Sequence, residues 1–344
     1  MSLVDVIKSE EQLDDVLTTP SQELIDACRQ LADPLIVLGA GGKMGPSLAV
    51  LARRAIEQAG VGVRVIAVSR FNNASSKDYL HAHGVETQSA DVFDRKQLNA
   101  LPDASNVVYL VGMKFGTSSD PVPTWATNTI APVHACERFK GAKIVALSTG
   151  NVYPLCDIAS GGSLESDAVT PVGEYPNAAV ARERIFQHYA VTSNTPVVLM
   201  RLNYAHDLHY GVLTDIASKI WRGEPIDVTM GYFNAIWQGD ANERILRSFD
   251  LCSSPATVVN LTSPEVYSVR AVALQLGSLL DRQVHLVGHE APTALLSNTD
   301  VMQSKLGQPR VGLEQMLKWI ADWINSGGAI HNKPTHFQTR DGKF

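Results

Sequence analysis

The sequence predicts an α/β fold built on a doubly wound parallel sheet with helices on both faces. Five short runs rich in β-branched residues are apolar almost throughout, which is typical of strands buried on both faces. These runs span 34–40, 63–69, 106–112, 142–148 and 195–201. Stretches with helical periodicity separate them at 46–58, 124–139 and 175–190. A chain of 344 residues is long enough for one large domain and a smaller companion.

The pattern changes on either side of this alternation, so four segments are expected. Ser9 with Gln12 resembles a capping box and Ser21 begins a second apolar-periodic run, which predicts two short helices. After the fifth run the elements become irregular, until two helical stretches near 268–281 and 311–326. The expected segments are a helical extension (1–33), a sheet domain (34–200), a smaller substrate-binding lobe interleaved with the last sheet elements (201–330), and a polar tail (331–344). We expect this tail to be loose or to reach a partner subunit.

The composition argues against several classes of function. A formal net charge of −6 leaves no basic excess for a general nucleic-acid binder. No apolar run approaches the ~20 residues needed to span a bilayer, and the acidic N-terminus lacks the apolar core of a signal peptide. The four cysteines have neither CxxC nor zinc spacing, which favours reduced thiols. We therefore expect a cytoplasmic protein with no nucleic-acid, membrane or metal partner.

A glycine-rich turn follows the first predicted strand. In LIVLGAGGKMGPSLAVLARRA, three glycines stand between a strand and a helix with G-x-x-G-x-x-G spacing. Glycines permit a tight turn there, while the helix N-terminus offers unpaired N–H groups to a pyrophosphate. A tight turn without a ligand is the alternative interpretation. The context favours a Rossmann-type dinucleotide-binding site that includes Gly39, Gly41, Gly42, Lys43, Met44 and Gly45.

The end of the second predicted strand bears on which dinucleotide binds. A carboxylate there would hydrogen-bond the adenosine ribose of NAD, but the sequence has Ser69 and Arg70. Arginine suits a 2′-phosphate, so NADP is favoured over NAD, and Lys43 supports this more weakly. The alternative is that Arg70 lies on a solvated loop. Asp91 could accept a hydrogen bond from the adenine amino group or cap the next helix.

Taken in chain order, five landmarks resemble the extended short-chain dehydrogenase/reductase superfamily, of the NAD-dependent epimerase/dehydratase kind, over about residues 34–325. They are the glycine turn, SADVFD with Asp91, WATNTIAPVHACE with Asn128, LSTGNVYP and ESDAVTPVGEYPNAA. VGMKFG is also similar to the AGLK stretch of UDP-galactose 4-epimerases, where the lysine approaches the cofactor. The resemblance implies that the cofactor site also includes Asp91, Val92, Val111, Gly112, Lys114, Asn128 and Tyr175.

The resemblance also implies a catalytic set. In this family a Ser or Thr, a Tyr and a Lys cooperate in hydride transfer at a sugar carbon. Carried over by position, Thr149 holds the substrate oxygen, with Ser148 beside it, and Tyr175 moves the proton. The family's lysine binds the nicotinamide ribose and lowers the pKa of the tyrosine, but here its position is Ala179. The chain therefore resembles an atypical member that lacks the active-site lysine.

Another cation would have to replace that lysine. Arg182 lies about 10 Å along the helix from Tyr175, which predicts no direct contact. Lys114 is the better candidate, although contact with the pyrophosphate is at least as good an interpretation of its role.

The substrate wall is expected in RLNYAHDLHYGVL, which begins at the end of the run at 195–201. The residues predicted to bind substrate are Thr149, Asn151, Asn203, His206 and Tyr210. The resemblance implies an NAD(P)-dependent oxidoreductase or epimerase acting on a hydroxyl or carbonyl of a sugar, nucleotide-sugar or sugar acid. It also implies a homodimer that pairs through the helices at 124–139 and 175–190. The alternative is a non-catalytic NADP-binding sensor or scaffold of the same fold.

Overall fold

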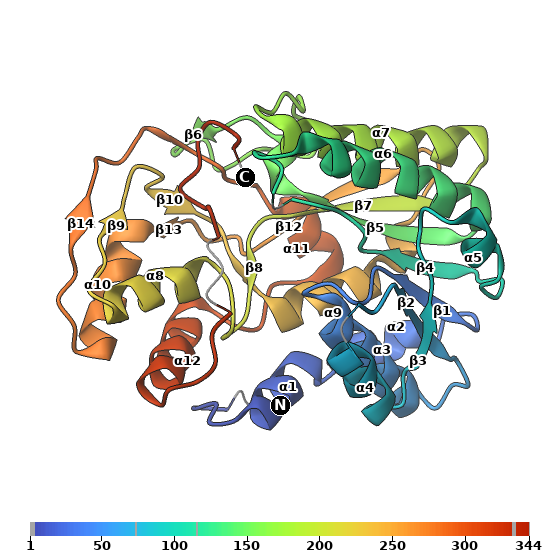
Figure 1. Cartoon of the computed structure of the whole chain (residues 1–344), viewed down its shortest axis with the longest axis horizontal. Coiled ribbons are helices and arrows are strands. Elements are labelled where there is room, and N and C mark those ends of the chain that lie inside the picture. The colour runs from blue at the N-terminus through green and yellow to red at the C-terminus, as the bar shows by residue number, and fades with distance from the viewer. Residues whose placement is uncertain (1–3, 73, 115, 332–334, 344) are drawn as a thin grey trace.

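The computed structural model describes residues 4–72, 74–114, 116–331 and 335–343 (Figure 1). Its centre is a seven-stranded sheet in the order β12-β7-β5-β4-β1-β2-β3, and all neighbouring pairs are parallel. The strands are β1 (Leu35–Leu38), β2 (Val65–Ser69), β3 (Glu86–Ser89), β4 (Asn106–Tyr109), β5 (Lys143–Thr149), β7 (Val197–Leu202) and β12 (Thr257–Leu261). The doubly wound α/β fold predicted from the sequence is confirmed.

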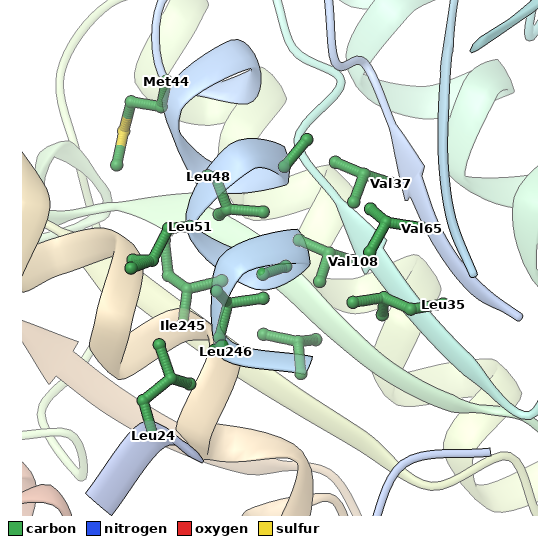
Figure 2. Packing of buried hydrophobic residues seen from close by; sticks show 14 of the residues in the cluster. Leu24, Leu35, Val37, Met44, Leu48, Leu51, Val65, Val108, Ile245 and Leu246 are labelled. Carbon is green, nitrogen blue, oxygen red and sulfur yellow. The ribbon is translucent and has the colours of Figure 1, made fainter. Parts of the chain in front are cut away.

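Helices cover both faces of this sheet (Figure 1). One face carries α2 (Gln22–Cys28), α3 (Gly45–Ala59) and α9 (Gln238–Arg247), and the other carries α5 (Arg95–Asn99), α6 (Pro121–Arg138) and α7 (Glu174–Thr192). Successive strand residues point to opposite faces, so Leu35 and Val37 enter the α3 core while Ile36 and Leu38 enter the α6–α7 core. Figure 2 shows the α3 core, in which Leu48 and Val108 are fully buried. Each such side chain contributes about 1.5–3 kcal/mol of burial free energy.

The N-terminal residues form α1 (Glu10–Thr18) and α2, which start where the sequence predicted. The Ser9 hydroxyl accepts a hydrogen bond from the Gln12 N–H at 3.2 Å, and Ser21 caps α2 in the same way. Leu13 and Leu24 are fully buried, and the two helices lie against α3 and α9. The extension is therefore part of the packed structure.

A second hydrophobic core forms the C-terminal lobe, built on α8 (Val212–Trp221), α10 (Val269–Leu280) and α12 (Leu313–Asn325). Trp237 and Trp319 meet at its centre, with ring centroids 5.1 Å apart. Its margins carry the short pairs β6 (Cys156–Asp157) with β15 (Thr293–Ala294), β8 (Ala205–His206) with β11 (Ile236–Trp237), β9 (Ile226–Asp227) with β14 (Leu286–Val287), and β10 (Tyr232–Phe233) with β13 (Tyr267–Ser268). The remaining helices are α4 (Ala74–Ala82), α11 (Asp300–Leu306) and two 3₁₀ turns, Gly150–Val152 and Ser248–Leu251. Within the described ranges, no helix combines the length and apolarity that crossing a bilayer requires.

Residues 335–343, here called the C-terminal segment, pack against their own chain rather than lying loose. The Thr335 hydroxyl donates to Asp215 of α8 at 2.7 Å, and Phe337 is 2% exposed. The Arg340 guanidinium donates to the Thr293 carbonyl oxygen at 2.7 Å. Figure 1 shows this red segment ending near the start of α7. The segment therefore spans from the C-terminal lobe to the Rossmann-type part of the fold.

Candidate active site

A cavity of about 750 Å³ opens at the carboxyl ends of β1, β2 and β4, where ligands of open α/β sheets bind. The glycine turn after β1 forms one wall, and the loops after β2 and β4 form the others. Most predicted cofactor residues line it: Gly39, Gly41, Gly42, Ser69, Arg70, Asp91, Val92, Val111 and Gly112.

The glycine turn fits a dinucleotide pyrophosphate. The N-cap of α3, Met44, makes no side-chain cap hydrogen bond. Gly45 N donates to the Gly42 carbonyl oxygen at 3.3 Å and Pro46 has no N–H, so this helix start offers fewer N–H groups to a ligand than a regular helix N-terminus does. Gly45 lies so close to Ala40 that a Cβ atom would collide with its backbone, which keeps the start of α3 tight against β1. Unpaired N–H groups at a helix N-terminus bind phosphate oxygens.

Two residues stand at the end of this cavity expected to hold the adenosine. Arg70 is exposed, and it has no hydrogen-bond or ion-pair partner within the described part of the chain. Asp91 lines the cavity and accepts from the Phe93 N–H at 2.9 Å. The cap of α5 is Asp94. Helix capping, the alternative role considered for Asp91, therefore falls to Asp94.

Lys43, Met44 and Gly45 lie outside the lining of this cavity, contrary to prediction. Lys43 points toward the C-terminal lobe, where its Nζ donates to the carbonyl oxygens of Ala205 and Tyr210 at 3.1 and 3.2 Å. Met44 is buried in the α3 core (Figure 2). These residues shape the turn or link it to the lobe.

Asn128 also lies behind the cavity wall, because its side chain is fully buried in α6. Its Nδ2 donates to the carbonyl oxygens of Met113 and Thr124 at 3.0 and 2.8 Å. Met113 lines the cavity. Asn128 therefore positions the loop after β4 instead of contacting the cofactor region itself.

A second cavity, of about 260 Å³, is here called the catalytic cavity. It shares Leu110, Gly112 and Met113 with the first, so the two are neighbours along one wall. Among the predicted site residues it is lined by Lys114, Ser148, Thr149, Asn151, Tyr175 and Tyr210. Thr149 ends β5 and Tyr175 lies in the first turn of α7. The fold thus brings the expected hydroxyl and phenol to one cavity.

The two neighbouring hydroxyls of β5 differ in their partners. Thr149 Oγ1 accepts hydrogen bonds from Asn151 N and Nδ2 at 3.2 and 3.1 Å, which leaves its own proton available for donation. Ser148 Oγ instead donates to Glu183 Oε1 at 2.5 Å. Thr149 is therefore better suited than Ser148 to hold a substrate oxygen.

Glu183 belongs to a buried charged network. It is 1% exposed and pairs with the 3% exposed Arg201 of β7 at 2.7 Å. Arg201 NH1 also donates to the Tyr153 hydroxyl at 2.6 Å, and that hydroxyl donates to Asn260 of β12 at 2.8 Å. The network ties α7 to three strands of the sheet, and so fixes where Tyr175 stands relative to Thr149.

Ala179, at the position of the family's lysine, is fully buried among Val152 and Tyr153. A cation does lie beside Tyr175, because the Lys114 Nζ is 5.9 Å from the Tyr175 ring centre. Burial lowers the pKa of Lys114 to about 8. Lys114 is therefore mostly charged at pH 7 and mostly neutral above pH 9.

Arg182 lines the catalytic cavity too, although no role was predicted for it there. Its guanidinium donates to Asn128 Oδ1 at 2.7 Å and lies where a Cβ atom on Gly112 would collide with it. Helical side chains lean toward the helix N-terminus, which lets Arg182 reach back toward Tyr175's end of α7. Its spacing of seven residues from Tyr175, on the same face, was the available signal.

Two of the predicted substrate residues do not reach the catalytic cavity. Asn203 is 1% exposed and donates to the Leu295 carbonyl oxygen at 3.2 Å. His206 is fully buried, with Nε2 2.7 Å from the Met316 sulfur, and burial lowers its pKa to about 3. Tyr204 and Thr335 line the cavity instead. No local pattern marked Thr335, because only the path of the C-terminal segment takes it there.

Comparisons with known proteins bear on the family and the fold. A family model described as the NAD dependent epimerase/dehydratase family matches residues 35–229. The comparison with curated protein sequences found no match.

Several solved structures share the fold. One is UDP-glucose 4-epimerase of Thermotoga maritima with UDP-glucose, at 16% identity and a TM-score of 0.70, covering 86% of this chain and 99% of that one. Another is dTDP-glucose 4,6-dehydratase of Bacillus anthracis with NAD, at 16% identity and a TM-score of 0.71, covering 86% of this chain and 97% of that one. A third is the epimerase Mth375 of Methanothermobacter thermautotrophicus, at 16% identity and a TM-score of 0.74, covering 89% of this chain and 96% of that one. At such identities the likeness concerns the fold alone, and this chain has segments outside each match.

Proposed function

Because this chain belongs to the NAD-dependent epimerase/dehydratase family, we propose that it is an NAD(P)-dependent oxidoreductase or epimerase. Its substrate would carry a hydroxyl or carbonyl group on a sugar or sugar acid, or on a sugar attached to a nucleotide. One observation carries the proposal: Thr149 and Tyr175, from separate elements, line a cavity that adjoins the glycine-turn cavity.

The proposed chemistry follows from these side chains. A bound nicotinamide dinucleotide supplies or accepts a hydride. The Thr149 hydroxyl donates a hydrogen bond to the substrate oxygen and holds it near Tyr175. The Tyr175 hydroxyl gives a proton to that oxygen during reduction or takes it during oxidation. Leu147 and Leu202 form an apolar part of the cavity wall, which would keep water away from the reacting carbon.

Lys114 is proposed to supply the positive charge that Ala179 cannot. While Lys114 is protonated its ammonium places a positive charge beside the Tyr175 ring, and this charge is lost as pH rises through about 8. The Arg182 guanidinium, which also lines the cavity, adds a second positive charge.

NADP is proposed as the preferred dinucleotide. The support is the exposed Arg70 in the lining of the larger cavity, together with a serine at the end of β2. The Bacillus anthracis neighbour was solved with NAD. Direct comparison of the two cofactors on this chain therefore tests the proposal.

The test of function is hydride transfer, followed at 340 nm with a panel of sugars, sugar acids and nucleotide-sugars. Tyr175→Phe should lower the rate on an accepted substrate by roughly 10²-fold or more, as loss of general acid–base catalysis does. Tyr189→Phe is a matched control, because Tyr189 is also on α7 but its hydroxyl contacts Glu137, away from the cavity. Full activity of the Tyr175→Phe variant would contradict the proposal that the Tyr175 hydroxyl transfers the proton.

A non-catalytic NADP-binding sensor or scaffold is the second candidate, favoured by the buried Ala179. Dinucleotide binding without hydride transfer to any compound of the panel, in the wild-type chain, would support this candidate.

We also propose a homodimer that forms through α6 and α7. Val122, Trp125 and Ile130 of α6 are 71%, 36% and 44% exposed, and Val191 of α7 is 63% exposed. Phe186 of α7 does not belong to this surface, because it is buried against Tyr109 with ring centroids 5.0 Å apart.

A further inference from the structure

The C-terminal segment crosses the substrate side of the proposed site. It begins at Thr335, bound to Asp215 of α8, and Phe337 then packs beside Phe233 with ring centroids 6.4 Å apart. Arg340 is held by Thr293 of β15. The segment therefore has anchors at several points of the C-terminal lobe.

The far end of the segment rests on the loop just before α7. Gly342 has φ +73°, and a Cβ atom there would collide with the Val172 carbonyl oxygen. A Cβ atom on Gly173 would likewise collide with the Gly342 carbonyl oxygen. Tyr175 lies two residues after Gly173, so the segment contacts the start of α7, the helix that carries Tyr175.

The catalytic cavity shares lining residues with two others, and the segment lies beside both. A cavity of about 270 Å³ shares Asn151 with it and is lined by Thr339, Arg340 and Gly342. A cavity of about 520 Å³ shares Tyr210 and Gly211 with it. Thr335 lines the catalytic cavity and is bound to Asp215, which lines the 520 Å³ cavity.

The space left for a substrate is small. Sites for drug-sized ligands measure roughly 300–1,000 Å³, whereas the catalytic cavity holds about 260 Å³. Part of that volume must also admit the reactive end of the dinucleotide. A nucleotide-sugar would have to extend its diphosphate and nucleoside into one of the adjoining cavities.

The charges of the larger of those two cavities do not suit a diphosphate, which is bound by uncompensated Arg or Lys side chains. Among the described lining residues, the 270 Å³ cavity offers Arg340 as its cation; the Thr293 carbonyl oxygen and hydroxyl accept hydrogen bonds from Arg340 and hold it in position without neutralising its charge. In the 520 Å³ cavity, Lys219 lies 3.8 Å from Asp215 and Arg222 lies 2.7 Å from Glu224. Each cation there already has a carboxylate beside it.

Resting on the proposed function, we infer that the C-terminal segment restricts the site to a small, non-nucleotide substrate: a polyhydroxylated alcohol or carbonyl compound of monosaccharide size or less. Thr149, Asn151 and Tyr210 supply hydroxyl and amide groups for its oxygens. Nucleotide-sugars are excluded by the segment, which lines the 270 Å³ cavity, and by the paired charges of the 520 Å³ cavity.

The test compares the wild-type chain with the double variant Arg340→Ala, Gly342→Val, which removes one anchor and forces the segment off Val172. Lys343→Ala is the control, because its side chain is 76% exposed and pairs only with Asp341 among the contacts described. UDP-glucose binding to the NADPH-loaded protein is measured by calorimetry. We expect dissociation constants above ~1 mM for wild type and control, and at least ~tenfold tighter binding by the double variant.

Tight binding of UDP-glucose by the wild-type chain would overturn the inference, and so would a double variant that binds no better than wild type. If the double variant does not fold, the affinity of the wild-type chain for UDP-glucose alone tests the inference. Turnover of free glucose or glucuronate at kcat/KM at least ~tenfold above that of the UDP conjugates supports the inference, and the reverse order refutes it. Absence of hydride transfer with every compound is a separate result that removes the proposed function, while the binding comparison still reports on the segment.

Discussion

Replacing Lys114 by methionine tests whether this residue stands in for the missing lysine. Its Nζ lies 5.9 Å from the Tyr175 ring centre. Two unit charges at that separation interact by about 0.7 kcal/mol in bulk water and about 2.8 kcal/mol at an effective dielectric of ~20. Loss of the charge should therefore slow alcohol oxidation at pH 7 by roughly 3- to 100-fold, because oxidation needs the ionised phenol. Carbonyl reduction, which needs the neutral phenol, should be affected less.

The same substitution should stabilise the fold. Burial lowers the pKa of Lys114 to about 8, below its ordinary value, so the folded chain holds this proton less tightly than the unfolded chain. Below pH 8 the charged lysine therefore costs folding free energy, on the order of 1–3 kcal/mol after allowance for its partial exposure. Between pH 8 and the unfolded value that cost is relieved as pH rises. Lys114→Met should thus raise Tm at pH 7 by a few degrees.

The assay follows oxidation rates from pH 6 to 10, with thermal melts of the same preparations. The ratio of wild-type to Lys114→Met rates should be largest near pH 7 and should approach one as wild-type Lys114 deprotonates above pH 8. Lys140→Met, at an exposed lysine outside both cavities, is the control. A ratio that stays flat across this pH range would refute the electrostatic role of Lys114.

Arg70→Ala should weaken NADP binding by about 1–3 kcal/mol in calorimetry and barely change NAD binding, because only NADP has the 2′-phosphate; equal losses would show that Arg70 does not read it. Burial lowers the pKa of His206 in the folded chain to about 3, so between pH 6.5 and about 3 the unfolded chain binds this proton and the folded chain does not. As the pH falls through this range, the free energy of unfolding should decrease by about 1.4 kcal/mol per pH unit, and urea melts of His206→Gln should show a weaker dependence on acid. Trp125→Glu should shift the protein to monomers in light scattering if α6 and α7 form the proposed interface, whereas an unchanged mass would exclude Trp125 from it.

Much of the fold was predictable because its signals are local. Ser9 and Ser21 cap helices through groups three residues away, and the glycine turn joins strand to helix within a few residues. Thr149 and Tyr175 were found for a similar reason: one ends a strand and the other begins a helix, both at recognisable motifs. Such positions depend little on distant parts of the chain.

The substrate wall was less predictable because it depends on side-chain direction and on distant contacts. Leu202 and Tyr204 line the catalytic cavity, whereas Asn203 between them is buried. Tyr204 has φ +49°, so the chain leaves the extended conformation after β7 and strand alternation does not predict where its side chain points. A shift of one residue in position therefore decides whether a side chain lines the catalytic cavity or is buried in the core. Thr335 and Arg182 reach the cavity through long-range packing and a long side chain, which periodicity does not report.

The buried pair of Glu183 and Arg201 has a consequence for how this chain can change over generations. Replacing either residue alone strands a buried charge, which typically costs 3–5 kcal/mol, whereas replacing both with apolar residues of similar volume is often neutral. Single substitutions at these two positions therefore lead through poorly folded intermediates. Substitutions that would let α7 shift against the sheet are therefore disfavoured from the first one. The spacing of Thr149 and Tyr175 is preserved for this reason while surface residues around the site can change.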